Sequence, residues 1–435
     1  MGPVIESSKE KAMMLDALAD DLDRRLAAAD AALLAGYPGD RGTRQPVHTV
    51  YVPGDRYDAG TLARWGAEAR AVLAEHGLSI TELTEALAGQ PHLAVEVHER
   101  VVAKLAREPI EDLRIDFEDG YGDRPDEQED ADAIAAARAL AGSVTAGTAA
   151  PYHGIRIKSF EAPTRRRALR TLDLFLGELA GADALTKGFV ITLPKVTSVD
   201  QVAAMVTVLE ALEVAHRITA GSLRFEIQVE TPQAILGADG SALVARMIHA
   251  GGRRVTGLHY GTYDYSASLG VAAAYQSMEH PVADHAKDVM QVAAAGTGVF
   301  VSDGSTNRLP VGDRDAVRAA WQLHLRLVGR SLARGIYQGW DLHPAQLPSR
   351  YVATYAFYRE GLLAASARLR AYVHGGQSGY LDEPATAAAL AGFVLRGLEC
   401  GAVEAAEIDQ LIGVEIEALA RLARRSAIAP DAGQV

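Results

Sequence analysis

The chain has 435 residues, with 43 Lys and Arg and 56 Asp and Glu, which gives a formal net charge of −13. This acidic balance argues against nucleic acid or an anionic membrane surface as the main partner. The single cysteine, Cys400, excludes an intrachain disulfide framework and a cysteine-rich zinc site, and it favours a reducing compartment. Because no run of about 18 apolar residues and no signal-peptide core occur, we expect a cytoplasmic protein without a membrane span.

Residues 1–46 are rich in Ala, Leu, Asp and Arg, and we expect them to form an N-terminal helical extension. Between residues 47 and 349, short β-branched runs alternate with helical segments, which predicts βαβ units and a parallel sheet. Extra helices are expected between the first two runs, at 59–75, 80–87 and 93–107. The predicted strands are 48–52, 113–117, 154–158, 188–193, 224–229, 255–260, 298–302 and 335–342.

Eight such repeats over about 300 residues favour an α/β fold of the (β/α)8 TIM-barrel type, with an open doubly wound sheet as the alternative. Residues 350–435 continue as helical segments without a strand pattern and are predicted to be a C-terminal helical region. The active site of a TIM barrel lies where the strands end. The polar residues after each predicted strand are therefore the functional candidates.

Two carboxylates follow neighbouring predicted strands. Glu230 comes directly after the buried-strand pattern of 225–229, and Asp264 follows the next strand. Adjacent strand ends would bring both side chains to one point, and two carboxylates with water suit Mg²⁺ or Mn²⁺. A helix cap or a salt bridge for each carboxylate is the simpler alternative. Zinc is disfavoured because the chain has no His-x-x-x-His helix.

Two cations precede these carboxylates along the chain. Arg156 lies inside an otherwise apolar run, so its guanidinium needs a partner, either a substrate carboxylate or an acidic residue such as Glu118. Lys195 follows Leu193-Pro194 and is a candidate for a Schiff base, although a lysine that pairs with a carboxylate is the simpler interpretation.

Several common catalytic motifs are missing from the sequence. Without a Gly-x-x-x-x-Gly-Lys-Ser/Thr loop or a Gly-x-Gly-x-x-Gly after the first strand, nucleotide hydrolysis and dinucleotide binding are disfavoured. Without a Gly-x-Ser-x-Gly turn, an α/β-hydrolase is disfavoured as well. Cys400 lies in a helical region far from the strand ends, which argues against a nucleophilic role.

The residues at the predicted strand ends, taken in chain order, resemble the motifs of the HpcH/HpaI aldolase and citrate lyase β-subunit superfamily. The resemblance covers about residues 47–348, and it is specific because eight short motifs occur in the same order. The motifs are Tyr51-Val-Pro-Gly54, Asp116-Phe-Glu-Asp119-Gly120, Ile155-Arg-Ile157, Leu193-Pro-Lys195, Val229-Glu-Thr231, Gly261-x-x-Asp264 with Leu269-Gly270, Ser302-Asp-Gly304 and Gly339-Trp-Asp-Leu-His343-Pro-Ala-Gln346.

The resemblance implies a metal-dependent carbon–carbon lyase or aldolase. Its substrate would be a 2-oxo acid, such as pyruvate, glyoxylate or oxaloacetate, or the hydroxy acid formed from it. It also implies a homo-oligomer, usually a trimer or hexamer, with Mg²⁺ or Mn²⁺ held by Glu230 and Asp264.

The same resemblance implies roles for the remaining candidates. Arg156, Glu118 and Asp119 would take part in catalysis: Arg156 would bind the substrate carboxylate, and Glu118 and Asp119 would order the site. Further substrate contacts are expected from Lys195, Thr231 and Tyr263.

The sequence departs from the members that use acyl-CoA. Those members begin the first strand with Arg-Ser-x-Leu-Phe, whereas residues 47–51 are Val-His-Thr-Val-Tyr, and the missing arginine argues against a CoA thioester. Asp382-Glu-Pro384 resembles an Asp-x-Pro segment that supplies a catalytic acid or base to a neighbouring subunit, so Asp382 is a further catalytic candidate. Two alternatives are an acyl-CoA-dependent enzyme (a lyase, a malate synthase-like condensing enzyme or a thioester hydrolase) and a catalytically inactive binding protein.

Overall fold

Eight parallel strands form a barrel in the computed structural model, which describes residues 2–77, 91–376, 379 and 382–424. The strands follow one another around the barrel in chain order, and β1 pairs with both β2 and β8. A bridge between Ser302 and Gln338 joins β7 to β8, and Trp340 N adds a hydrogen bond to Gly304 O across the same gap. The predicted (β/α)8 TIM barrel is therefore confirmed.

All eight predicted strands are present, but only β6 has the predicted bounds, and the differences are largest for β3 and β8. β3 begins two residues earlier than predicted because Tyr152 pairs with Asp112 of β2, and it ends at Arg156. β8 begins only at 339, because Gly335, with a φ of 78°, lies in the turn that follows helix α12. The strands are β1 (His48–Pro53), β2 (Asp112–Asp116), β3 (Tyr152–Arg156), β4 (Phe189–Leu193), β5 (Phe225–Val229), β6 (Val255–Tyr260), β7 (Phe300–Ser302) and β8 (Gly339–Asp341).

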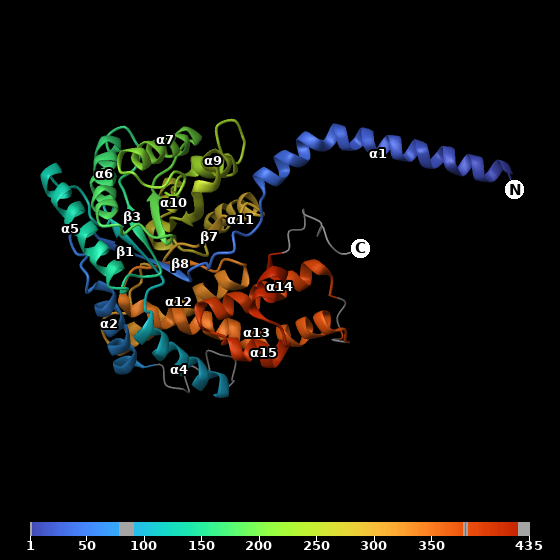
Figure 1. Cartoon of the computed structure of the whole chain (residues 1–435). Helices are drawn as coiled ribbons and strands as arrows, with labels where there is room; N and C mark the ends of the chain where they lie inside the picture. The colour runs from blue at the N-terminus through green and yellow to red at the C-terminus, as the bar shows by residue number, and fades with distance from the viewer. Residues whose placement is uncertain (1, 78–90, 377–378, 380–381, 425–435) are drawn as a thin grey trace.

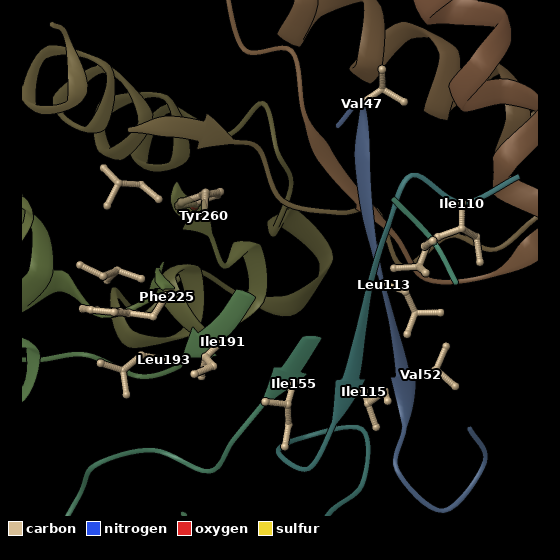
Figure 2. Close-up of a cluster of buried hydrophobic side chains, with 14 of the residues drawn as sticks. Val47, Val52, Ile110, Leu113, Ile115, Ile155, Ile191, Leu193, Phe225 and Tyr260 are labelled. Atoms are coloured by element: carbon tan, nitrogen blue, oxygen red, sulfur yellow. The ribbon is translucent and has the colours of Figure 1, made fainter. Parts of the chain in front are cut away.

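The apolar core lies outside the barrel, between the strands and the helices. Side chains alternate between the two faces of a strand, and the outward positions are apolar. Figure 2 shows part of this layer, with Leu113 and Ile115 of β2, Ile155 of β3 and Phe225 of β5. These side chains are buried and belong to one continuous hydrophobic cluster that includes the helices.

The inward positions are mostly polar. Arg114 of β2 reaches Glu226 of β5, and Trp340 of β8 reaches His259 of β6, so these hydrogen bonds cross the barrel interior. Branched aliphatic side chains usually fill this space. Here ion pairs and hydrogen bonds replace them in a lower layer near the N-terminal ends of the strands. A second polar layer at the opposite ends forms the candidate site.

Helices surround the barrel in the expected alternation. The predicted helices 59–75 and 93–107 correspond to α2 and α4, whereas 80–87 lies outside the described residues. A capping box formed by Ser198 and Gln201 starts α7. The elements are α2 (Thr61–His76), α4 (Pro91–Arg107), α5 (Asp126–Thr145), α6 (Arg165–Gly181), α7 (Val199–Ala215), α8 (Pro232–Ile235), α9 (Leu243–Gly251), η1 (Gly252–Arg254), α10 (Thr262–Ser268), η2 (Ala273–Tyr275), α11 (Pro281–Ala294), α12 (Arg314–Ala333) and η3 (Pro344–Gln346).

One long helix, α13 (Leu347–His374), joins the barrel to the C-terminal region and spans the predicted boundary between 349 and 350. Its first half contributes Tyr351 and Tyr355 to the main core. Its second half packs with α14 (Pro384–Cys400), α15 (Ala405–Ile412) and α16 (Ile416–Ala423) around a second apolar cluster.

Helix α1 (Gly2–Gly36) projects away from the rest of the molecule (Figure 1). Large apolar side chains along it, such as Leu15, Leu18 and Leu22, are exposed. Among the described residues, no helix combines the length and the apolar character that a bilayer crossing requires.

Candidate active site

Lys195 lies at the centre of the candidate active site, in the turn that follows β4. Its φ of 51° is in the left-handed region, which costs a non-glycine residue about 1–2 kcal/mol. In this conformation Lys195 N donates a 2.7 Å hydrogen bond to Glu230 Oε1. The ammonium contacts Glu118 and lies 2.8 Å from Asp119 Oδ2 and 3.5 Å from Asp264 Oδ2. Four predicted acidic residues thus converge on one lysine.

The surroundings keep Lys195 positively charged. Burial alone would lower the pKa of its ammonium group, but the negative charges of Glu230 and Glu118 and the hydrogen bond to Asp119 raise the pKa instead. A Schiff base requires a neutral amine. The geometry therefore favours a lysine that pairs with carboxylates over a covalent nucleophile.

Glu230 is buried at the end of β5, with 1% of its surface exposed. Gln228, two residues earlier and on the same face of the strand, donates a 2.5 Å hydrogen bond from Nε2 to Glu230 Oε2. The backbone of Gly261 lies so close that a Cβ atom there would be 2.5 Å from Glu230 Cβ. Burial raises the pKa of Glu230 to about 8, and the nearby charges of Glu118 and Asp264 act in the same direction.

Asp264 lies in the first turn of α10, which begins directly after β6. Its side chain is 47% exposed, in contrast to the buried Glu230. Lys195 contacts both carboxylates, through its backbone N–H and through its ammonium group. The pair thus has one buried member and one that faces solvent.

Arg156 is buried at the end of β3 and is held by Asp116. Its Nε and Nη2 donate to the two carboxylate oxygens of Asp116 at 2.6 and 2.7 Å. Its Nη1 lies 3.3 Å from Gln228 Oε1 and 3.4 Å from Glu118 Oε2. Asp116 is therefore the main partner of Arg156, and only Nη1 is directed toward Glu118.

Two aromatic rings also lie beside the Arg156 guanidinium. The ring centres of Tyr51 and Trp340 are 4.5 and 5.9 Å from its central carbon. Such contacts favour a cation, especially in a desolvated position. The guanidinium is therefore held from several sides.

Asp116 also fixes the turn that carries Glu118 and Asp119. It accepts hydrogen bonds from Glu118 N at 3.0 Å and from Gly120 N at 2.9 Å. Burial raises the pKa of Glu118. Burial would raise the pKa of Asp119 as well, but the Lys195 ammonium outweighs this effect and lowers it. Within the turn, Glu118 is thus the weaker acid.

When all of its carboxylates are ionised, the cluster carries an excess of negative charge. The carboxylates of Asp116, Glu118, Asp119, Glu230 and Asp264 face two cations, Arg156 and Lys195. Across the described ranges, no three His, Cys, Asp or Glu side chains form a ready-made metal site. However, Mg²⁺ commonly takes only one or two protein carboxylates and completes its shell with water and substrate oxygens. Glu230 and Asp264 fit such a site, and a divalent cation would offset the excess charge.

The other two predicted substrate contacts hold neighbouring loops. Thr231 Oγ1 donates a 2.6 Å hydrogen bond to Val196 O, which links the loops after β5 and β4. Tyr263 OH accepts a 2.5 Å hydrogen bond from Asn307 N and lies 3.4 Å from Ser305 O, in the loop after β7. Both side chains border the site and shape it through these loops.

Asp382 lies elsewhere, before α14 in the C-terminal region. It forms an ion pair with Arg368 of α13. Within the part of the chain that the structure describes, it contacts none of the strand-end side chains. A catalytic role for Asp382 would therefore have to operate between subunits, as the resemblance implies.

Gln228 was not predicted to be a site residue. Its role could have been predicted from its position. Gln228 lies two residues before Glu230 in a strand, and side chains two residues apart point to the same face, here the inward one. Tyr51 and Trp340 could not be assigned in this way, since their contact with Arg156 depends on how β8 closes onto β1.

Comparisons with known proteins agree with this fold. The family model described as "Domain of unknown function (DUF6986)" matches residues 26–427. No curated protein gives a significant match. A citrate lyase from Burkholderia xenovorans LB400 shares 19% identity at a TM-score of 0.55, and the match covers 85% of this chain and 99% of that one. This similarity confirms the fold that the resemblance to the citrate lyase superfamily predicted.

Two further solved structures have lower TM-scores. A Haloferax volcanii malate synthase in a magnesium and glyoxylate complex has 15% identity and a TM-score of 0.47, with 89% of this chain and 99% of that one covered. A citrate lyase beta subunit from M. tuberculosis, complexed with oxaloacetate and magnesium, has 17% identity and a TM-score of 0.41. That match covers 72% of this chain and 98% of the other.

Proposed function

The chain belongs to the family described as DUF6986, and we propose that it is a divalent-metal-dependent carbon–carbon lyase or aldolase. Its substrate would be the aldol adduct of a 2-oxo acid, which the enzyme cleaves or forms. The observation that carries this proposal is the acidic cluster around Lys195. Two of its carboxylates, Glu230 and Asp264, lie on neighbouring strand ends and have the oxygen donors that Mg²⁺ and Mn²⁺ prefer.

The chain would contribute positioning and fixed charge to the reaction. Lys195 and Nη1 of Arg156 are the cationic donors directed into the cluster, and both suit a carboxylate or a developing oxyanion. Asp116 holds the Arg156 guanidinium in place and fixes the turn of Glu118. A bound divalent cation would supply a Lewis acid for the 2-oxo group.

The first experiment is a calorimetric titration of EDTA-treated protein with Mg²⁺ or Mn²⁺. It is done with and without pyruvate, glyoxylate or oxaloacetate. We expect one metal ion to bind per chain and at least one oxo acid to bind only in its presence. Glu230→Gln and Asp264→Asn should each weaken metal binding at least tenfold, because each removes a charged ligand.

Asp55→Asn is the matched control. Asp55 follows β1 at the same end of the barrel, but its carboxylate contacts Arg124. This variant should bind metal like the wild type. Equal metal affinity in the wild type and both ligand variants would refute the proposed site. A requirement for a CoA thioester before any acid binds would favour the acyl-CoA alternative instead.

A further inference from the structure

The N-terminal end of the barrel contains a cavity with no assigned role. Residues 37–46, which connect α1 to β1, cross this end of the barrel. Arg41 donates from Nη1 to Arg253 O at 3.2 Å and from Nη2 to Val255 O at 2.5 Å, and Gly39 N donates to Gly296 O. Between this segment and the lower polar layer lies a cavity of about 70 Å³.

The inner wall of the cavity carries charged side chains that form ion pairs with one another. Arg114 binds Asp112 and Glu226, and His259 Nε2 lies 3.0 Å from Glu226 Oε2. All four side chains are buried. The two carboxylates of this wall are therefore already matched by protein groups.

The rim of the cavity is cationic. Besides Arg114, the cavity is lined by three cations, Arg41, Lys187 and Arg224, which we call the floor cations. Among the described residues, no carboxylate lies within ion-pair distance of any of them, and the side chains of Lys187 and Arg224 make no hydrogen bond. Burial lowers the pKa of Arg41 to about 10, and the nearby charges of Arg224 and Arg253 contribute to this shift. Such crowding of cations stands out in a chain with a net charge of −13.

The floor cations also border two larger hollows. Lys187 and Arg224 line one of about 560 Å³, together with His216 and Arg217, and Arg41 lines another of about 490 Å³. Each hollow has one carboxylate on its wall, Asp183 or Asp40, and no ion pair joins either to a floor cation. A ligand with one compact anionic group could therefore place that group at the rim and extend into a hollow.

We propose that the floor cations form a binding site for a compact dianion carried by a small metabolite, either a phosphate group or a dicarboxylate. Guanidinium and ammonium groups recognise both kinds of anion. Three cations on the rim and Arg114 behind them exceed the carboxylates of Asp112 and Glu226 by two charges. The site lies at the opposite end of the barrel from Glu230 and Asp264, so it does not depend on the proposed function.

The test is calorimetric titration of the metal-free full chain at low ionic strength. Inorganic phosphate and malonate are the two probes, and they separate the phosphate source from the dicarboxylate source. We expect at least one of them to bind. The double variant Lys187→Gln/Arg224→Gln should weaken that binding at least tenfold, because it removes two charge-assisted contacts. Arg70→Gln, an exposed arginine on α2, is the matched control and should leave the affinity unchanged.

Glu230→Gln separates this proposal from the proposed function, because it should retain anion binding at the floor cations. Absence of binding by both probes, an equal loss in Arg70→Gln, or a loss in Glu230→Gln would each overturn the proposal. If the double variant does not fold, Lys187→Gln alone gives the same comparison, since Lys187 is exposed and its side chain makes no hydrogen bond or ion pair with any described residue.

Discussion

At the scale of single residues, the Arg156–Asp116 pair depends on the shape of the guanidinium. Two nitrogens of Arg156 bind both oxygens of Asp116 inside the barrel, and the third is directed toward the acidic cluster. A lysine keeps the charge but cannot make two parallel hydrogen bonds and a third contact together. Arg156→Lys should therefore raise the KM for the oxo acid and lower the free energy of unfolding by about 1–3 kcal/mol.

Steady-state kinetics and urea unfolding measure these two effects. Arg138→Lys is the control, because Arg138 forms the same two-nitrogen pair with Glu178 on the surface, at 2.8 and 3.0 Å. Exposed pairs contribute about 0–1 kcal/mol, so this variant should unfold almost like the wild type. A wild-type KM in Arg156→Lys would remove Arg156 from substrate binding.

The type and order of the site residues could be predicted, but their pairing could not. The strand-end pattern selected Glu118, Lys195 and Glu230, and all three lie in one cluster. The expected acidic partner of Arg156 was Glu118, whereas the structure pairs it mainly with Asp116, because a pairing across strands depends on closure of the whole barrel. The left-handed backbone of Lys195 left no signal either, since no glycine marks that turn.

At the scale of elements, the junction between β6 and α10 depends on the absence of a side chain at Gly261. A Cβ atom there would lie 2.5 Å from Glu230 Cβ, and this part of Glu230 cannot move without moving β5. Gly261→Ala should therefore displace Glu230, weaken metal binding at least tenfold and cost about 1–3 kcal/mol of unfolding free energy. Calorimetry and urea unfolding test both parts.

Gly329→Ala is the natural control for this substitution. Gly329 lies inside α12, and an added Cβ atom there would meet nothing within 4 Å. Alanine favours a helix interior over glycine by about 0.5–1 kcal/mol, so this variant should be more stable than the wild type. The two glycine substitutions are thus expected to change stability in opposite directions, and equal changes would contradict the close approach at Gly261.

The strands could be predicted because β-branched runs alternate with helices, and this local pattern does not depend on the rest of the fold. The ends of the strands were predicted less accurately than their positions in the chain. β3 extends to Tyr152 because a neighbouring strand is available for pairing there, which is a tertiary effect. The sequence also did not predict that α13 continues across residues 349 and 350. The strand pattern of the barrel stops there, but the helix does not end.

At the scale of the whole molecule, charge is distributed unevenly between the two ends of the barrel. Carboxylates outnumber cations at the strand ends, where a divalent cation is proposed. At the other end lie three cations that have no carboxylate partner among the described residues. The lower polar layer of the interior lies between the two regions, so the net charge of the whole chain does not describe the charge at either end.

A second charged network connects the N-terminal segment to the barrel and to α13. Glu108 binds Arg44 of the segment before β1 and Lys104 of α4, and Lys104 lies over the ring of Tyr351 in α13. Burial alone would raise the pKa of Glu108, but the hydrogen bond to Arg44 and the charge of Lys104 outweigh it and lower the pKa from 4.5 to about 2. The carboxylate therefore stabilises the folded chain above about pH 4.5, and this contribution is lost as the pH falls toward 2.

Glu108→Gln should consequently lower the free energy of unfolding at pH 7 by about 1–3 kcal/mol. This loss does not exceed the free energy that corresponds to the pKa shift of Glu108. The difference from the wild type should shrink as the pH falls from about 4.5, because the wild-type carboxylate then becomes protonated as well. Urea unfolding at pH 7, 4 and 3 measures this trend, with Glu99→Gln on the exposed face of α4 as the control. A difference that stays constant down to pH 3 would assign the loss to packing rather than to charge.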